Sequence, residues 1–249
     1  MPPYLSIVIP AYNEQERIAD TLFAVKEYLS QQQYSSEVIV VDDGSTDFTT
    51  EVVRTVDIYS NEIRDQNVSV VMENVKNVGK GFSVARGMLK SQGTIILFSD
   101  ADLSTPIQEI EKLLPYFNEG YDIVIGSRNL PESEVEKKPF YRQLMSSTFR
   151  IIVQTLTVRG IQDTQCGFKA FRRDVAHDIA HLQRTYRFGF DVEQLYIAAK
   201  RGYRVKEVPV KWVHQEGSKV SIVRDSLAMI ADVMRIRGFH GKLKPKQER

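Results

Sequence analysis

The chain has 249 residues, 42% of them hydrophobic and 26% charged, an ordinary composition for a globular protein with one large core. Its 33 Lys and Arg residues nearly cancel its 32 Asp and Glu residues, which excludes a strongly basic protein that recruits nucleic acid through its net charge. Cys166 is the only cysteine, so an intrachain disulfide is excluded and a reducing compartment is indicated.

The first residues, Met1-Pro2-Pro3-Tyr4, lead directly into an apolar run and lack the basic segment of a signal peptide. No window of the sequence reaches the ~18 to 20 consecutive apolar residues of a membrane span. We therefore expect a cytoplasmic protein that is soluble or at most peripheral at a membrane.

Three strand–helix units are predicted in the first part of the chain. Each begins with a short apolar run, typical of a strand buried on both faces, and passes through a polar loop into apolar residues at helical spacing. Pro10 ends the first strand, and Ser45 is placed to cap the second helix. The predicted strands are 5–9, 37–41 and 68–72, and the helices carry Ile18, Leu22, Val25 and Leu29, then Phe48, Val52 and Val56, then the small residues Ser83, Ala85 and Gly87.

The later elements are less regular. A fourth strand at 95–98 ends in Asp100 and Asp102, and a fifth is predicted at 122–125. The polar segment 129–139 is either a lid over the site or a surface excursion. Further predicted elements are an amphipathic helix at 142–158, a return to the sheet at 164–171, an edge strand at 204–212 interrupted by Pro209, an amphipathic helix at 222–237 and a disordered basic tail at 242–246.

Alternating strands and helices predict an α/β fold, a Rossmann-like and mostly parallel sheet with helices on both faces. In such sheets ligands bind beyond the carboxyl ends of the strands. The polar loops 10–14, 42–45, 79–81 and 100–104 all follow predicted strands. We expect these four loops to meet at one edge of the sheet and to form a binding site.

Asp100 and Asp102 stand one residue apart at the end of a buried strand. Two carboxylates in this position can converge on one hard divalent cation, which prefers oxygen ligands and leaves positions open for a diphosphate. The alternative is an Asx-type turn that needs no metal.

The loops carry motifs that resemble those of a known family. SIVIPAYNE at 6–14, VVDDGSTD at 40–47, NVGKG at 77–81 and DAD at 100–102 resemble, in order, the signatures of family 2 glycosyltransferases with the GT-A fold. Within that family, DADLSTP at 100–106, GSR at 126–128, DTQCGFK at 163–169, FDVE at 190–193 and GSK at 217–219 most resemble the dolichyl-phosphate β-glucosyltransferases. The dolichyl-phosphate mannose synthases come second.

The resemblance implies a single GT-A domain over residues 1–249. It divides into a nucleotide-sugar-binding half at 1–106, an acceptor-binding half at 107–238 and a basic tail at 239–249. It also implies that Asp102 is the metal ligand, for Mg²⁺ or Mn²⁺. The residues implied around the nucleotide sugar are Pro10, Tyr12, Glu14, Asp42, Lys80, Asp100 and Ala101. For Tyr12 the alternative is packing in the core.

The donor is predicted from Ser104. The mannose synthases carry Gln at this position, two residues after the metal-binding Asp, whereas Ser is typical of the glucosyl-type pattern. The resemblance therefore favours UDP-glucose over GDP-mannose as the donor.

The chemical class of the acceptor determines which other residues are needed for binding and catalysis. A polyprenyl phosphate is already anionic and needs no general base, but it needs fixed cations, for which the resemblance implies Arg128, Arg142 and Lys219. A sugar hydroxyl would need a base, and Asp191 would then take that role; otherwise Asp191 is structural. Attack opposite the departing diphosphate inverts the anomeric centre.

Three readings of the whole chain follow. The first is a metal-dependent, inverting transferase of glucose to a polyprenyl or dolichyl phosphate at the cytoplasmic face of a membrane. The second is transfer from GDP-mannose, or transfer to a sugar hydroxyl. The third is a nucleotide-binding module without catalysis. Membrane contact through the helices 142–158 and 222–237 and the basic tail is one prediction, and packing of both helices on the sheet is the alternative.

Overall fold

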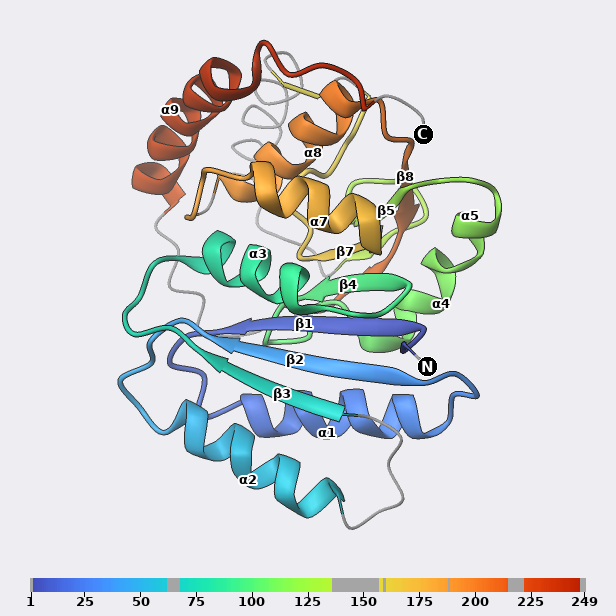
Figure 1. The fold of residues 1–249 in the computed structure, drawn as a ribbon, viewed down its shortest axis with the longest axis vertical. Coiled ribbons are helices and arrows are strands. Elements are labelled where there is room, and N and C mark those ends of the chain that lie inside the picture. Colours follow the sequence, from blue (N-terminus) through green and yellow to red (C-terminus); the bar gives the residue numbers. More distant parts are fainter. Residues whose placement is uncertain are drawn as a thin grey trace.

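The computed structural model of the chain describes residues 2–61, 68–135, 157–158, 160–187, 189–214 and 222–246. Its centre is a sheet with the strand order β3-β2-β1-β4-β7-β5-β8 (Figure 1). Every neighbouring pair is parallel except those of β7, which runs antiparallel to both β4 and β5. The strands are β1 Leu5–Ala11, β2 Ser36–Asp42, β3 Val68–Glu73, β4 Ile95–Ser99, β5 Ile123–Ser127, β7 Phe168–Arg172 and β8 Val205–Pro209.

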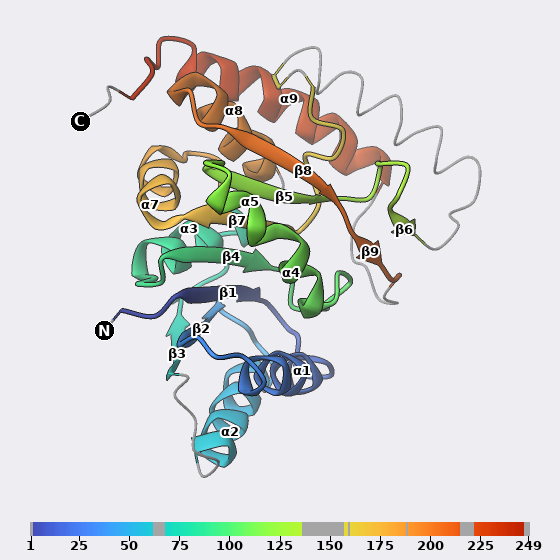
Figure 2. The same ribbon diagram turned by 90° about the vertical axis from the view of Figure 1, so that its right-hand side faces the viewer.

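Helices cover both faces of this sheet (Figure 2). One face packs against α1 Ile18–Ser30, α2 Thr49–Asn61, a 3₁₀ turn at Ile107–Glu109, α4 Ile110–Leu113 and α5 Pro115–Asn118. The other packs against α3 Lys80–Lys90, α7 Arg173–Leu182, α8 Phe190–Arg201 and α9 Ile222–His240. The predicted fold class is confirmed.

The period-two pattern of the strands explains the two cores. Leu5, Ile7 and Ile9 of β1 belong to the cluster on one face, while Val8 belongs to the cluster on the other. All four side chains are fully buried. Continuous apolar strands are what a sheet covered on both faces requires.

Small residues in α3 allow a close approach to the sheet, as predicted. A Cβ atom placed on Gly87 would lie 2.4 Å from a methyl carbon of Val8 and 3.1 Å from one of Val41. A contact of 2.4 Å is not tolerated between real carbon atoms, so this close approach of the helix to the sheet requires glycine at position 87.

Several local predictions need correction. Ser45 does not cap α2: the Asp47 carboxylate accepts the Thr49 N–H at 3.0 Å, and the helix begins at Thr49. Phe48 lies outside the helix and is 69% exposed. The first strand continues one residue past Pro10, which pairs in register with Val41.

The second half contains structure that the sequence patterns missed. The helices α7 and α8 were not predicted, although Val175, Ala176, Ile179 and Ala180 show helical spacing and are buried. The polar segment 129–139 contains β6 Glu134–Val135, which pairs with β9 Lys211–Trp212. Residues 136–139 of this segment and most of the predicted helix at 142–158 lie outside the described residues.

The predicted disorder of the basic tail is wrong for residues 242–246. Leu243 packs against the core, and the Lys246 N–H donates to the Arg201 carbonyl at 3.0 Å. Arg201 in turn forms two hydrogen bonds to Asp178. The apolar Leu243 and these hydrogen bonds hold the tail, which its charge alone did not indicate.

Candidate active site

The loops after β1, β2 and β3 are joined through Asp43, which the sequence analysis did not single out. Its buried carboxylate accepts the backbone N–H groups of Val78 and Gly79, at 3.1 and 2.8 Å, and the side-chain amide of Asn74 at 2.8 Å. The Asp43 N–H donates to the Ala11 carbonyl at 2.8 Å. A carboxylate with this many donors fixes the relative positions of the loops.

The predicted nucleotide residues lie on these joined loops. The Asp42 carboxylate accepts the N–H groups of Gly44 and Ser45, at 3.1 and 3.0 Å, and is buried at the end of β2. Glu14 forms an ion pair with Arg17. Tyr12 is 38% exposed, so its ring faces outward and the alternative of core packing does not hold.

The turn of Asp100, Ala101 and Asp102 is held by three other parts of the chain. The Asp100 N–H donates to the Gly167 carbonyl at 3.1 Å, and the Thr21 hydroxyl of α1 donates to the Ala101 carbonyl at 2.6 Å. Beyond the turn, the Val213 N–H donates to the Ser104 carbonyl at 2.8 Å. Residues distant in sequence therefore position both carboxylates.

Asp102 makes the Asx-type turn that was the alternative to a metal site. Its Oδ1 accepts the Ser104 N–H at 2.9 Å, and Leu103 between them has a φ of +44°. Leucine rarely adopts this left-handed conformation, so the turn holds Leu103 in a strained geometry. The turn uses Oδ1 and is compatible with a metal bound through Oδ2.

A cluster of charged side chains lies around the ring of Phe98, the last apolar residue of β4. Lys80 Nζ lies 2.6 Å from Asp100 Oδ1, and Lys169 forms an ion pair with Asp191. The two ammonium nitrogens are 5.4 and 5.7 Å from the centre of the Phe98 ring. This arrangement brings the starts of α3 and α8 together with the end of β4.

Lys169 is the residue of this cluster that the sequence analysis missed. It is fully buried, and its ammonium also donates to the Cys166 carbonyl at 2.7 Å. The signal was a lysine between Phe168 and Ala170 in a strand with both faces covered, because a buried cation requires a partner. That partner, Asp191, could be identified only from the fold.

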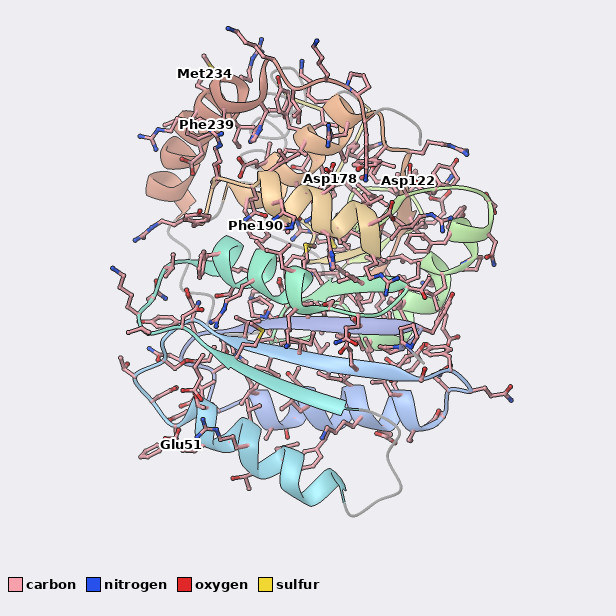
Figure 3. The ribbon with its side chains drawn as sticks, viewed as in Figure 1. Glu51, Asp122, Asp178, Phe190, Met234 and Phe239 are labelled. Carbon is pink, nitrogen blue, oxygen red and sulfur yellow. The ribbon has the colours of Figure 1, made fainter. Side chains whose placement is uncertain are left out.

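Asp191 stands in the first turn of α8 beside Phe190, which Figure 3 labels. The Phe190 ring packs edge-on against that of Phe98. Burial raises the pKa of Asp191, although the ammonium groups of Lys169 and Lys80 oppose the rise. For Lys80, burial disfavours the charged form, but the carboxylates of Asp100 and Asp191 raise its pKa. The ion pair with Lys169 favours a structural role for Asp191 over that of a general base.

Arg128 follows β5 and is held by Asp163, another residue outside the predicted set. Its Nε donates to Asp163 Oδ2 at 2.7 Å, and its Nη2 donates to Oδ1 at 2.9 Å. The guanidinium also lies 5.8 Å from the centre of the Trp212 ring. Two of its nitrogens are engaged, which orients the third, Nη1. Arg142 and Lys219, the other predicted acceptor cations, lie outside the described residues.

The residues present fit a divalent cation. Asp100 Oδ1 is buried and receives no hydrogen bond of acceptable geometry, since Lys80 approaches it only as an ion pair. Within the described ranges, no three His, Cys, Asp or Glu side chains gather closely enough to hold a metal ion by themselves. Two carboxylates supply the oxygen ligands that Mg²⁺ or Mn²⁺ prefers, and the oxygens of a diphosphate would complete the set.

Comparison with known proteins identifies the family. The model of glycosyl transferase family 2 matches residues 6–180. A dolichyl-phosphate beta-glucosyltransferase of Dictyostelium discoideum is 38% identical over 245 residues, which cover 94% of this chain and 74% of that protein. The relative with the same name in Homo sapiens is 36% identical with the same coverage. The one in Saccharomyces cerevisiae is 33% identical over 248 residues, again covering 94% and 74%.

Solved structures share the fold at lower sequence identity. Glucosyl-3-phosphoglycerate synthase from Mycobacterium tuberculosis, in complex with Mn²⁺, UDP-glucose and phosphoglyceric acid, matches with a TM-score of 0.69 at 18% identity, covering 98% of this chain and 82% of that one. A mannosyltransferase from Pyrobaculum calidifontis, in complex with GDP-mannose and Mn²⁺, matches with a TM-score of 0.63 at 20% identity, covering 94% and 65%. With the family match over most of the sequence, the chain belongs to glycosyltransferase family 2 and is a glycosyltransferase with the GT-A fold.

Proposed function

We propose that this enzyme transfers glucose from UDP-glucose to dolichyl phosphate, with inversion at the anomeric carbon. The observation that carries the proposal is the set of relatives named dolichyl-phosphate beta-glucosyltransferase, at 33 to 38% identity over nearly the whole chain. The site is compatible with that reaction, because it combines a carboxylate pair at one loop with an oriented arginine at another.

The donor binds over the loops that Asp43 joins. The exposed Tyr12 ring offers a flat apolar surface to the base, and the carboxylates of Asp42 and Glu14 accept from the base imide and the ribose hydroxyls. Pro10, Ala101 and Lys80 complete this side of the site. The buried Ser104, whose carbonyl is fixed by Val213, stands where the mannose-type pattern has Gln and favours UDP-glucose.

Asp102, with Asp100 beside it, would hold Mg²⁺ or Mn²⁺. Such a cation, when bound, offsets the negative charge that develops on the departing nucleoside diphosphate. The complexes of the two structural neighbours with Mn²⁺ and a nucleotide sugar are consistent with this assignment. The chain's own contribution is to keep the two carboxylates in place through Gly167, Thr21 and Ser104.

The acceptor phosphate is placed against Arg128, with Arg142 and Lys219 as the further cations. Asp163 fixes the Arg128 guanidinium, so the group meets the phosphate in one orientation and with little loss of side-chain entropy. A phosphate oxygen is anionic near neutral pH and attacks without a base. The pairing of Asp191 with Lys169 agrees with such an acceptor, which needs no base.

The enzyme is proposed to work at the cytoplasmic surface of a membrane, where the headgroup of its acceptor lies. No helix in the described part of the chain is both long enough and apolar enough to cross a bilayer. Met234 and Phe239 of α9 are 58% and 45% exposed, and Figure 3 shows them at the outer side of the molecule. Arg235 and Arg237 on the same helix are exposed as well, which suits an anionic lipid surface.

The test of the proposed function is a panel of donors and acceptors. Purified enzyme would be incubated with UDP-glucose, UDP-galactose, UDP-N-acetylglucosamine or GDP-mannose, each with dolichyl phosphate or dolichol, and the products identified by mass. We expect glucosyl dolichyl phosphate to form only from UDP-glucose with dolichyl phosphate. Transfer from GDP-mannose alone would establish the mannosyl reading, and no transfer from any donor would contradict the proposal.

A further inference from the structure

The two lysines around Phe98 differ in how firmly they are held. Lys169 is fully buried, and its ammonium is bound both to Asp191 and to the Cys166 carbonyl. Lys80 is the first residue of α3, and 34% of its side chain is exposed. Its flexible four-carbon side chain can therefore move its charge, whereas that of Lys169 cannot.

The Asp100 carboxylate that Lys80 contacts lies against Gly167. A Cβ atom on Gly167 would lie 2.1 Å from Asp100 Oδ2 and 2.4 Å from Oδ1, so the whole carboxylate is packed at this glycine. Oδ1 is buried, lacks a hydrogen bond and lies 2.6 Å from Lys80 Nζ. Lys80 is therefore the group that neutralises this oxygen.

The charges of the cluster make this contact consequential. Lys169 is paired with Asp191, and Lys80 lies opposite Asp100, with the carboxylates of Asp191 and Asp102 close enough to stabilise its charge as well. While Lys80 stays in place, a divalent cation arriving alone meets a half-neutralised carboxylate pair and is repelled by a nearby ammonium. A nucleotide diphosphate would change this balance, because its negative charge offers Lys80 a new partner.

We propose that Lys80 is the resident counter-ion of Asp100 and leaves it for the diphosphate of the incoming nucleotide, so that the divalent cation binds well only together with the nucleotide. This inference rests on the proposed function for the presence of the metal and the diphosphate. It adds a physical reason for the cation and the nucleotide to promote each other's binding, and it names Lys80 as the residue responsible. Such mutual promotion is reciprocal, and typical couplings are about 5- to 150-fold.

The experiment measures Mn²⁺ binding without any sugar transfer. Free Mn²⁺ is followed by its electron paramagnetic resonance signal while each protein is titrated, first alone and then with saturating UDP. For the wild type we expect weak binding that tightens about tenfold or more with UDP. For Lys80→Met we expect Mn²⁺ alone to bind about tenfold more tightly than to the wild type, and a smaller gain on adding UDP.

Controls separate this effect from a general change in charge or fold. Lys90→Met removes the same charge from the exposed end of the same helix and should behave as the wild type. Lys80→Arg keeps a cation beside Asp100 and should restore the weak binding of Mn²⁺ alone. Lys80→Gln serves as a second neutral variant if Lys80→Met does not fold, as judged by circular dichroism and thermal unfolding.

Two results would overturn the inference, and they differ. If folded Lys80→Met and Lys80→Gln bind Mn²⁺ alone no more tightly than the wild type, Lys80 does not compete with the cation, although the proposed function stands. If the wild type binds no Mn²⁺ even with UDP, the metal assignment itself is wrong and the role of Lys80 falls with it.

Discussion

The carboxylate of Asp163 holds the Arg128 guanidinium through two parallel hydrogen bonds, from Nε at 2.7 Å and from Nη2 at 2.9 Å. The same carboxylate accepts the Arg128 N–H at 2.9 Å, so backbone and side chain are fixed together. Glu207 of β8 accepts the Asp163 N–H at 2.7 Å and thereby ties the pair to the sheet edge. This relationship makes Asp163 a positioning residue whose loss should affect both stability and acceptor binding.

Asp163→Asn should lower the free energy of unfolding by about 3 kcal/mol near pH 7, because it leaves a largely buried guanidinium without its counter-charge. Burial opposes ionisation, but Arg128 lowers the pKa of Asp163 to about 2 from 3.8. Because the pKa of Asp163 is lower in the folded protein than in the unfolded chain, its ionised carboxylate stabilises the fold at pH values above about 4. This stabilisation is lost as the pH falls from about 4 toward 2. Urea unfolding of both proteins at steps between pH 7 and pH 3 would show the difference shrinking below about pH 4. Equal stabilities at pH 7 would contradict the prediction.

Arg128→Ala should reduce transfer to dolichyl phosphate about 100-fold while changing the Kd of UDP by less than about threefold, since the nucleotide loops are built by other residues. Initial rates and calorimetric titration with UDP would give the two values. Arg54→Ala, which removes an exposed arginine paired with Glu73, is the matched control and should leave both unchanged. Equal losses of transfer and of UDP binding would place Arg128 at the donor diphosphate instead.

Asp102→Asn should abolish transfer, by at least about 100-fold at saturating UDP-glucose and Mn²⁺, because a neutral amide weakens the cation that stabilises the leaving diphosphate. The fold should persist, since an Asn side-chain oxygen still accepts the Ser104 N–H. Rates and melting temperatures would be compared with those of Glu51→Gln, an equal charge change on α2, where Figure 3 shows Glu51 at the opposite end of the molecule from α9. Undiminished turnover of Asp102→Asn would remove the metal assignment.

Gly167→Ala should displace the Asp100 carboxylate, because the new Cβ would lie 2.1 to 2.4 Å from its atoms. We expect a stability loss of about 1 to 3 kcal/mol, typical of overpacking, and weakened UDP binding in the presence of Mn²⁺. The control is Gly238→Ala, where a Cβ meets nothing within 4 Å. Wild-type UDP affinity in Gly167→Ala would show that Asp100 need not hold its position.

Binding to vesicles that contain anionic lipid should depend on α9. The double variant Met234→Ser, Phe239→Ser should reduce co-sedimentation at least about threefold, because two exposed apolar side chains no longer enter the interface. Phe23→Ser on α1, which is 53% exposed in the wild type, is the matched control. Truncation before His240 is unsuitable, since that residue is hydrogen-bonded to the buried Glu193 at 2.7 Å. Wild-type binding by the double variant, or none by the wild type, would contradict docking through this helix.

Local patterns in the sequence were sufficient for the fold class and for the loops that form the site. Apolar runs such as Leu5 to Ile9 predict strands buried on both faces, and strand–helix alternation leaves few arrangements other than a mostly parallel sheet. Because the carboxyl ends of parallel strands meet at one edge, the positions of Asp42 and Asp100 along the chain already place them in one site.

The partners of the charged groups were decided only by the tertiary structure. Arg128 and Asp163 are 35 residues apart, and Lys169 and Asp191 are 22 apart. No helical or strand periodicity in the sequence relates residues so far apart. Lys169 reaches the site because β7 is inserted antiparallel between β4 and β5. A buried charge must have a counter-charge or hydrogen-bond partners. The sequence shows that Lys169 requires such a partner, but only the packing of distant elements determines that the partner is Asp191.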